Sequence, residues 1–283
     1  MTDNYLLKTA DAQDIYFKIK DLPIVDYHCH LSPKEIYEDK PFDNIGEMWL
    51  GGDHYKWRLM RTAGIDEGYI TGNTDWREKF IKYAAALELA AGNPLYHWSH
   101  MELSMFFGID KPLKSDNAAE IYDEANTFIA ENRLSPRKLI EQSKVETLCT
   151  TDDIIDTLEY HKKIKEDKSF KTRVLPSFRT DNLLLVRRTG YPHYIKKLAE
   201  VSDAEITDLE GLKAAVIKRL DFFCLNGCRF TDVGIPYFPD RIADEPSADD
   251  TFKKALAGAE RFGHAQRGRA GIEEQRIAVL NVR

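Results

Sequence analysis

The stretch Leu22-Pro23-Ile24-Val25-Asp26-Tyr27-His28-Cys29-His30 places a short apolar run directly before two histidines. The run Leu22–Tyr27 predicts a buried strand. Side chains two residues apart on an extended chain point the same way, so His28 and His30 can reach one ion. Neutral imidazole is a good ligand for zinc and similar divalent metals. Two histidines in a polar loop are the alternative, but the preceding strand and acid favour a metal site.

Three later apolar runs also predict buried strands, at Val145–Thr150, Arg173–Ser177 and Cys228–Val233. Their apolarity is continuous rather than alternating, as parallel strands covered on both faces require. Helices are predicted between them, at Asp152–Lys165 and Asp208–Asn226. This alternation predicts an α/β fold, a partial TIM-like (β/α)8 barrel of about four strands. Such barrels carry their chemistry at the carboxyl ends of the strands, where the two histidines fall.

A large helical insertion is expected after the first strand, with helices at Trp76–Ala91, Pro94–Phe107 and Asn117–Asn132. Asp75 and Asn93 are the expected N-caps of the first two of these helices. The predicted organisation has four parts: the N-terminal segment with strand one (1–30), the insertion (31–144), strands two to four with their helices (145–258), and an atypical tail (259–283).

Composition narrows the class of protein. The chain has 283 residues, 43% of them hydrophobic, which is enough for a sizeable core, and its net charge is −7. This mild acidity argues against a nucleic-acid surface. No run approaches the roughly 18 apolar residues of a membrane span, so no membrane partner is expected. The acidic start, Met1–Tyr5, is unlike a signal peptide, and the few cysteines suit a reducing compartment. We therefore expect a cytoplasmic protein.

A second candidate segment is Gly51–Arg61, which is rich in hydrogen-bond donors. Adjacent glycines let a backbone approach a ligand closely. Tyrosine and histidine side chains such as Tyr55 and His54 can exchange protons with a substrate. An exposed helix start with solvated basic residues is an equally good interpretation of this segment alone.

Two further candidates follow predicted strands. Arg179 lies just past the third strand, where an arginine suits an anionic substrate. An ion pair between Arg179 and Asp181 is the structural alternative. Asp232 closes the fourth strand and can face a metal or a sugar hydroxyl, although a cap or turn role is favoured there.

Structural roles are expected for a cluster of aromatic and histidine side chains inside the insertion. His97 and His100 are three residues apart on a predicted helix, which allows a second metal site but favours packing and surface roles. Trp98, Phe106 and Phe107 are expected in the core of the insertion.

Taken together, these segments resemble the uronate isomerases (glucuronate/galacturonate isomerase) of the amidohydrolase superfamily. The likeness runs from about residue 5 to about residue 254. It rests on five stretches: Ile24–Pro33, Gly52–Arg61, Asn93–Trp98, Val145–Asp153 and Leu175–Asp181.

This resemblance implies an aldose–ketose isomerase that converts D-glucuronate to D-fructuronate and D-galacturonate to D-tagaturonate. It implies that His28 and His30 are metal ligands, that Tyr55 and His54 are catalytic, and that Arg179 binds substrate. It also implies a divalent metal cofactor, zinc first, with manganese or iron as alternatives. The expected partner is a small hexuronate, and a homo-oligomer stays open.

One departure from the family pattern matters. Members of the family are longer, and they add a later histidine and, from the last strand, an aspartate with a nearby arginine. We find no matching segments here, and residues 259–283 have a different composition, so a truncation or frame change is one hypothesis. Two alternatives therefore stand beside the isomerase: a non-catalytic fragment, and a metal-dependent hydrolase of the same superfamily.

Overall fold

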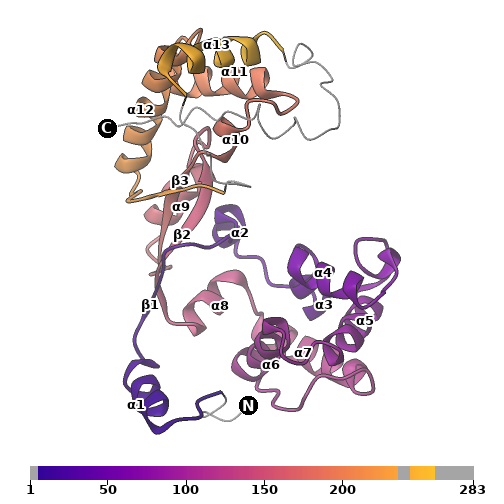
Figure 1. Ribbon diagram of the computed structural model, residues 1–283. Coiled ribbons are helices and arrows are strands. Elements are labelled where there is room, and N and C mark those ends of the chain that lie inside the picture. Colours follow the sequence, from indigo (N-terminus) through magenta and orange to yellow (C-terminus); the bar gives the residue numbers. More distant parts are fainter. Residues whose placement is uncertain (1–5, 235–242, 259–283) are drawn as a thin grey trace. The chain divides into compact units, whose positions relative to one another are not determined.

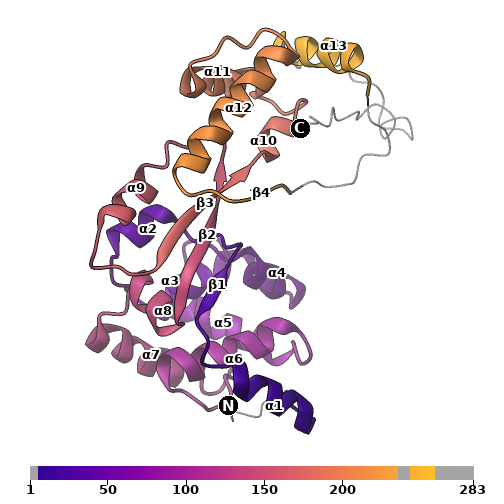
Figure 2. The same ribbon diagram turned by 90° about the vertical axis from the view of Figure 1, so that its left-hand side faces the viewer.

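Four strands form one sheet in the order β1-β2-β3-β4, so neighbours in sequence are neighbours in space (Figure 2). The computed structural model describes residues 6–234 and 243–258. The strands are β1 (Ile24–Asp26), β2 (Val145–Asp153), β3 (Arg173–Arg179) and β4 (Thr231–Asp232). Their arrangement confirms that the four predicted runs build one α/β sheet.

The register of the sheet brings the carboxyl ends of the strands to one edge. β2 pairs parallel to β3, with Thr151 opposite Ser177, and β3 pairs parallel to β4, with Arg179 opposite Asp232. The Cys29 amide donates to the Cys149 carbonyl over 2.9 Å, which holds the chain after β1 beside β2. Side chains that follow the strands therefore share one end of the sheet.

The expectation that all four strands are buried is wrong for two of them. Within β1, Ile24 and Val25 are exposed, and Thr231 of β4 is exposed as well. The reason is topological, because β1 and β4 are the edge strands of the described sheet. An edge strand has a neighbour on one side only, whereas β2 and β3 are covered as predicted.

The chain divides into two compact units, and each is built from two separate sequence segments. Unit 1 comprises residues 1–24 and 38–145, and unit 2 comprises residues 25–37 and 146–283. The histidine pair and the later strands therefore belong to unit 2, and most of the predicted helical insertion belongs to unit 1.

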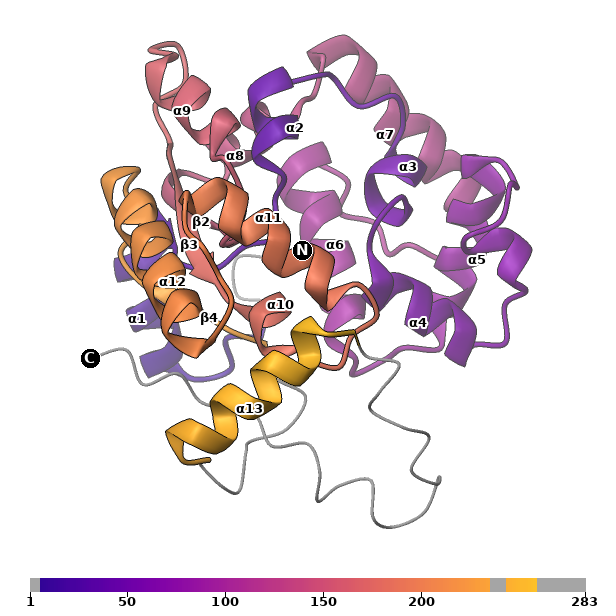
Figure 3. The ribbon, with the colours of Figure 1, turned by 90° about the horizontal axis from the view of Figure 1, so that it is seen from above.

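Unit 1 is helical. Its elements are α1 (Ala10–Ile19), α3 (Ile45–Leu50), α4 (His54–Thr62), the 3-10 turn η1 (Glu67–Tyr69), α5 (Trp76–Glu88), α6 (Pro94–Phe107), α7 (Ala118–Asn132) and α8 (Pro136–Gln142). Figure 3 shows α3, α5 and α7 together, and these helices contact one another. Phe80 and Tyr83 of α5 are fully buried in their shared core, against Trp49 of α3.

Unit 2 sets helices around the later strands. They are α2 (Pro33–Glu38), α9 (Glu159–Glu166), α10 (Asp181–Leu184), α11 (Tyr191–Ser202), α12 (Leu209–Leu225) and α13 (Glu245–Leu256). Figure 1 shows α11, α12 and α13 grouped together, and they pack on one another. The ring of Phe223 on α12 meets that of Phe178 on β3 edge to face, 5.2 Å between centroids. This contact fastens a helix to the outer face of the sheet.

Most helix predictions hold, and two details are wrong. The predicted helix Pro94–Phe107 is found at those bounds, with Asn93 as its N-cap. The segment from Asp152 is not helical at first, because β2 runs on to Asp153 before α9 begins at Glu159. Trp98 is 55% exposed rather than core.

The position of Trp98 follows from helix geometry. Leu95, Ser99 and Leu103 face the core, whereas Trp98 forms an exposed stripe with Met101 and Met105, three and seven residues further along α6. The predicted tail 259–283 lies outside the described residues. Among the helices that are described, none combines the length and apolarity needed to cross a bilayer.

Candidate active site

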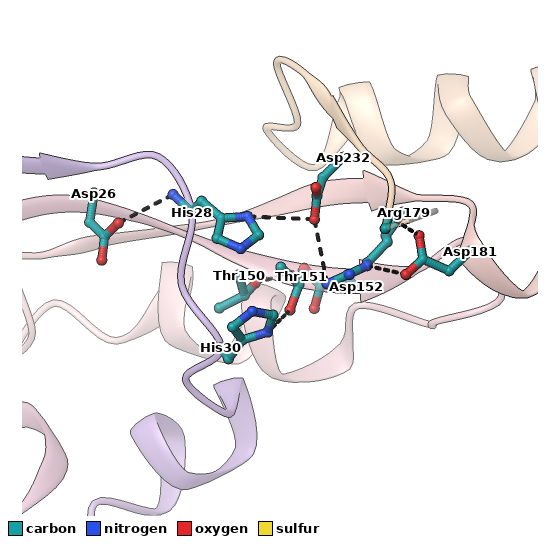
Figure 4. A network of polar contacts seen from close by, with 10 residues as sticks. Asp26, His28, His30, Thr150, Thr151, Asp152, Arg179, Asp181 and Asp232 are labelled. Atoms are coloured by element: carbon teal, nitrogen blue, oxygen red, sulfur yellow. Dashed lines mark hydrogen bonds and ion pairs between the residues drawn. The ribbon is translucent and has the colours of Figure 1, made fainter. Parts of the chain in front are cut away.

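His28 and His30 lie just beyond β1 and turn toward the same side (Figure 4). Their ring centroids are 4.9 Å apart and the rings are perpendicular. The Asp26 carboxylate accepts the His28 backbone N–H over 3.2 Å, which shapes the chain as it leaves the strand. The close approach expected from the His-x-His spacing is therefore present.

Thr151 supports the second histidine. Its Oγ1 lies 3.0 Å from Nδ1 of His30. A hydrogen bond at one ring nitrogen of a histidine fixes the ring orientation and decides which tautomer is present. When Nδ1–H of His30 donates to Thr151, the lone pair of Nε2 becomes the metal-binding position.

The side chain of Asp232, on β4, lies close to residues at the ends of β1 and β3. Its Oδ2 atom is 3.5 Å from His28 Nδ1 and 3.5 Å from Arg179 Nη1. The same oxygen is buried and has no hydrogen-bond partner. A buried carboxylate oxygen without a partner is costly, so it marks a position that a cation, a proton or a substrate hydroxyl would stabilise.

Arg179 is held by a second carboxylate. Its Nε donates to Asp181 Oδ2 over 2.8 Å, which confirms the ion pair considered from the sequence. The other oxygen of Asp181 accepts the Gly234 backbone N–H over 2.7 Å. The guanidinium therefore sits between Asp181 on one side and Asp232 on the other.

The opposite face of β2 carries a separate buried network. Thr150 Oγ1 donates to Asp152 Oδ2 over 2.7 Å and lies 2.8 Å from His161 Nε2 on α9. Burial raises the pKa of Asp152 to about 6 and lowers the pKa of His161 to about 4. Because residues alternate along a strand, this network backs Thr151 rather than facing the histidine pair.

Cys29 lies between the two histidines. Burial raises the pKa of its thiol to about 11, and Asp26 adds to the rise. Because side chains alternate along an extended chain, the Cys29 side chain is expected on the side opposite the two imidazoles, which favours a packing role.

The chemistry of these residues fits a divalent metal, but the residues that the structure describes supply only part of a ligand set. Two imidazoles and the Asp232 oxygen that lacks a hydrogen bond are donors that zinc and related ions accept. Over residues 6–234 and 243–258, no three His, Cys, Asp or Glu side chains converge as a metal site does.

His54 and Tyr55 belong to unit 1, at the start of α4. Their rings lie 4.5 Å apart between centroids and are tilted by 30°, and the Tyr55 side chain is exposed. Asp53 caps the helix by accepting the amides of Tyr55 and Lys56. Burial alone would raise the Asp53 pKa, but the Lys56 ammonium 2.8 Å away leaves that pKa lowered. Both aromatic side chains are thus presented at a rigid helix start.

His100, by contrast, has the structural role expected of it. Its Nδ1 lies 2.6 Å from the Tyr96 carbonyl, and its Nε2 accepts the Leu113 amide over 2.9 Å. Burial lowers the pKa of this imidazole. Both ring nitrogens are in use, so His100 is not offered to a ligand.

The structure brings three of the predicted site residues together and adds others. His28, His30 and Arg179 meet at one end of the sheet, with Asp232, for which the sequence favoured only a cap or turn role. Thr151 was missed, although its place at the carboxyl end of a predicted strand was a usable signal. The catalytic roles of His54 and Tyr55 stay predictions.

Comparison with known proteins identifies the family. The sequence profile of the glucuronate isomerase family matches residues 1–266. This chain belongs to that family. The uronate isomerase of Clostridium acetobutylicum is 47% identical to this glucuronate isomerase family member over 259 residues, and that of Caldicellulosiruptor bescii is 49% identical over 261 residues. Each alignment covers 91% of this chain and 55% of the relative, so the chain spans about half the length of these curated relatives.

Solved structures agree on the fold of this family member. The crystal structure of the uronate isomerase from Thermotoga maritima matches with a TM-score of 0.86 at 36% identity, over 92% of this chain and 57% of that one. The glucuronate isomerase from Caulobacter crescentus matches with a TM-score of 0.83 at 24% identity, over 91% and 56%, which supports the fold alone. The predicted resemblance and the predicted partial α/β barrel are confirmed.

Proposed function

We propose that this chain carries the amino-terminal part of the active site of a hexuronate isomerase, which interconverts D-glucuronate with D-fructuronate and D-galacturonate with D-tagaturonate. The single observation that carries the proposal is the meeting of His28, Asp232 and Arg179 at the carboxyl ends of the strands. Membership of the glucuronate isomerase family supports the same reaction class.

We propose His28 and His30 as ligands of a divalent metal, zinc first, with manganese or iron as alternatives. Such an ion supplies polarisation of the carbonyl or hydroxyl oxygens at C1 and C2 of the open-chain sugar. Thr151 orients the His30 ring for this task, and the Asp232 oxygen that lacks a hydrogen bond offers a third donor or a contact to a sugar hydroxyl.

Arg179 suits the carboxylate end of the substrate. A guanidinium presents a rigid set of donors that match a carboxylate, and this one is partly exposed at the site. Holding the carboxylate fixes which carbons of the chain reach the histidine pair, and positioning of this kind lowers the barrier to reaction.

Isomerisation then needs one proton moved between neighbouring carbons. A base removes the proton from C2 of the aldose, and the electron pair forms the C1–C2 double bond as the C1=O π bond breaks and its oxygen takes a proton, which gives the enediol. A proton then adds to C1 while the C2 hydroxyl loses its proton and becomes the ketone. We assign this acid–base role to Tyr55 and His54, whose side chains are presented together at the start of α4. These assignments rest on the resemblance and on the exposed phenol.

The proposal is tested by incubating the 283-residue chain with D-glucuronate and zinc chloride and following the sugar by ¹³C NMR. Appearance of D-fructuronate, lost in His28→Ala and retained in His97→Ala, supports an isomerase. Binding of D-glucuronate without turnover supports the second candidate, a non-catalytic fragment, which the incomplete set of described metal ligands favours. Hydrolysis of lactones or amides without isomerisation would overturn the proposal in favour of a hydrolase.

A further inference from the structure

The pair formed by Arg179 and Asp181 has a geometry that a simple surface ion pair lacks. The Arg179 Nε and Asp181 Oδ2 atoms are 2.8 Å apart, and each side chain is only about a quarter exposed, at 24% and 25%. Exposed ion pairs usually contribute little, because water screens the charges and the side chains stay mobile. Because both side chains are partly buried, water screens this ion pair less, and its side chains are more restricted than those of an exposed pair.

Asp181 is itself immobilised from a third element. Asp181 begins α10, directly after β3, and its Oδ1 accepts the Gly234 amide over 2.7 Å. Gly234 follows β4, the neighbouring strand. One carboxylate thus joins the ends of two strands and uses one oxygen for the backbone and the other for the guanidinium.

Gly234 also has a steric reason to be glycine. A Cβ atom at this position would lie 2.8 Å from Arg179 Nη2 and 3.1 Å from Asp181 Oδ2. Real Cβ atoms do not approach other heavy atoms to 2.8 Å, so a side chain here would push the guanidinium aside. The absent side chain is therefore part of what sets the position of Arg179.

These contacts restrict the directions in which the three guanidinium nitrogens of Arg179 can point. Nε is used by Asp181, Nη2 packs against Gly234, and Nη1 turns toward Asp232. We propose that Asp181 and Gly234 form a positioning clamp that aims the terminal nitrogens of Arg179 at Asp232 and the histidine pair. The clamp deepens the proposed function and rests on it only for the identity of the ligand, a carboxylate-bearing sugar.

The position of Arg179 can be measured without any substrate. In ¹H–¹⁵N spectra of the labelled 283-residue chain, the Arg179 Nε–Hε signal is the one lost in Arg179→Lys, or in Arg179→Gln should the lysine variant not fold. The clamp predicts a shifted, slowly exchanging signal. It should join the solvent-exposed arginines in Asp181→Asn and move in Gly234→Ala, while the backbone spectrum outside the site stays unchanged.

The matched control is a second arginine–carboxylate pair, whose arginine lies on the same strand. Arg173 begins β3, and its Nη2 lies 3.1 Å from Glu146 of β2, with both side chains exposed. Glu146→Gln removes a carboxylate from an arginine as Asp181→Asn does, and it should leave the Arg179 signal in place. An Arg179 signal that is unchanged in Asp181→Asn would overturn the clamp, whatever the sugar affinity.

Binding separates the clamp from the function on which it rests. With zinc chloride present, calorimetric titration of D-glucuronate should show affinity reduced about tenfold in Asp181→Asn and in Gly234→Ala, as for one lost charge-assisted contact. Glu146→Gln should bind like the parent chain. Failure of the parent chain to bind D-glucuronate would count against the proposed function, and the Arg179 signal alone would then decide the clamp.

Discussion

Asp232 Oδ2 lies 3.5 Å from His28 Nδ1, although β1 and β4 are the two edge strands of the described sheet. Strands in a sheet are about 4.8 Å apart, so a flat four-stranded sheet would separate its edges by roughly 14 Å. Two inward-pointing side chains on a curled sheet close that distance. The contact is therefore a direct sign of barrel-like curvature, and it gathers groups that a flat sheet would keep apart.

This contact predicts energetic coupling in metal binding. Zinc affinity should fall in His28→Ala and in Asp232→Ala, and the double variant should lose less than the sum of the two. The expected coupling is about 0.5–3 kcal/mol, as for residues in contact. Competition with a chromogenic chelator measures all three affinities. Strictly additive losses would contradict the coupling, and an unchanged zinc affinity in Asp232→Ala would show that Asp232 serves the substrate rather than the metal.

Thr151→Val should weaken zinc binding without disturbing the sheet. The valine has the same shape but lacks the hydroxyl that contacts His30, and loss of such a support typically costs about 10–100-fold in metal affinity. The same chelator competition gives the value. An affinity equal to that of the parent chain would mean that the His30 ring is oriented by other contacts.

The control for that experiment lies on the same strand. Thr147 is buried on β2, and its hydroxyl has no hydrogen-bond partner. Thr147→Val therefore removes an unsatisfied polar atom and should raise stability by about 1 kcal/mol, with zinc affinity unchanged. Hydrogen exchange of the β2 amides measures the change in stability.

The contributions of Asp152 and His161, which are buried together, to the pH dependence of stability should cancel. Burial raises the pKa of Asp152 to about 6 and lowers that of His161 to about 4. Between pH 4 and 6 the folded pair thus keeps one proton on Asp152. The unfolded chain also keeps one, on His161. Equal numbers of bound protons mean that this pair gives stability no slope with pH in this window.

Each single variant should uncover one half of this balance. In Asp152→Asn the unfolded state binds more protons between pH 4 and 6.5, so stability should rise with pH. In His161→Gln the folded state binds more protons between about pH 4 and 6, so stability should fall as pH rises. Each change is on the order of 2–3 kcal/mol. Hydrogen exchange of the β2 and α9 amides at pH 4.5 and 6.5 measures it, and parallel slopes in both variants would contradict the assignment.

Two substitutions on α6 should differ sharply in cost. Leu103 is fully buried, so Leu103→Ala should destabilise unit 1 by about 2–5 kcal/mol. Trp98, on the exposed stripe of α6, should tolerate alanine within about 0.5 kcal/mol. Urea unfolding followed by far-UV circular dichroism measures both, and equal costs would mean that the exposed face of α6 is also packed.

Local signals in the sequence predicted much of this fold. The Asn93-Pro94 pair set the start of α6, because an N-cap and a proline in the first turn specify a helix start within a few residues. Continuous apolar runs located β2 and β3. The His-x-His spacing predicted two imidazoles on one side, which the extended chain delivers.

What the sequence left open depends on how strands lie side by side. The exposure of Val25 follows from β1 being an edge strand, which its composition does not reveal. The role of Asp232 depends on sheet curvature, and the sequence alone favours a cap or turn role for an aspartate at a strand end. Thr151 gains its importance only from the histidine that it contacts, which follows a strand far away in the chain.

That distance along the chain has a consequence for synthesis. His30 and Thr151 are 121 positions apart, and unit 1 is largely encoded between them. At about 5–20 residues per second, a ribosome takes roughly 6–24 s to pass from one to the other. During this time the histidine segment has no strand to pair with, while the helices of unit 1 emerge. The end of the sheet that carries the histidine pair is thus assembled late, and conditions that slow elongation would extend the time before the histidine segment meets β2.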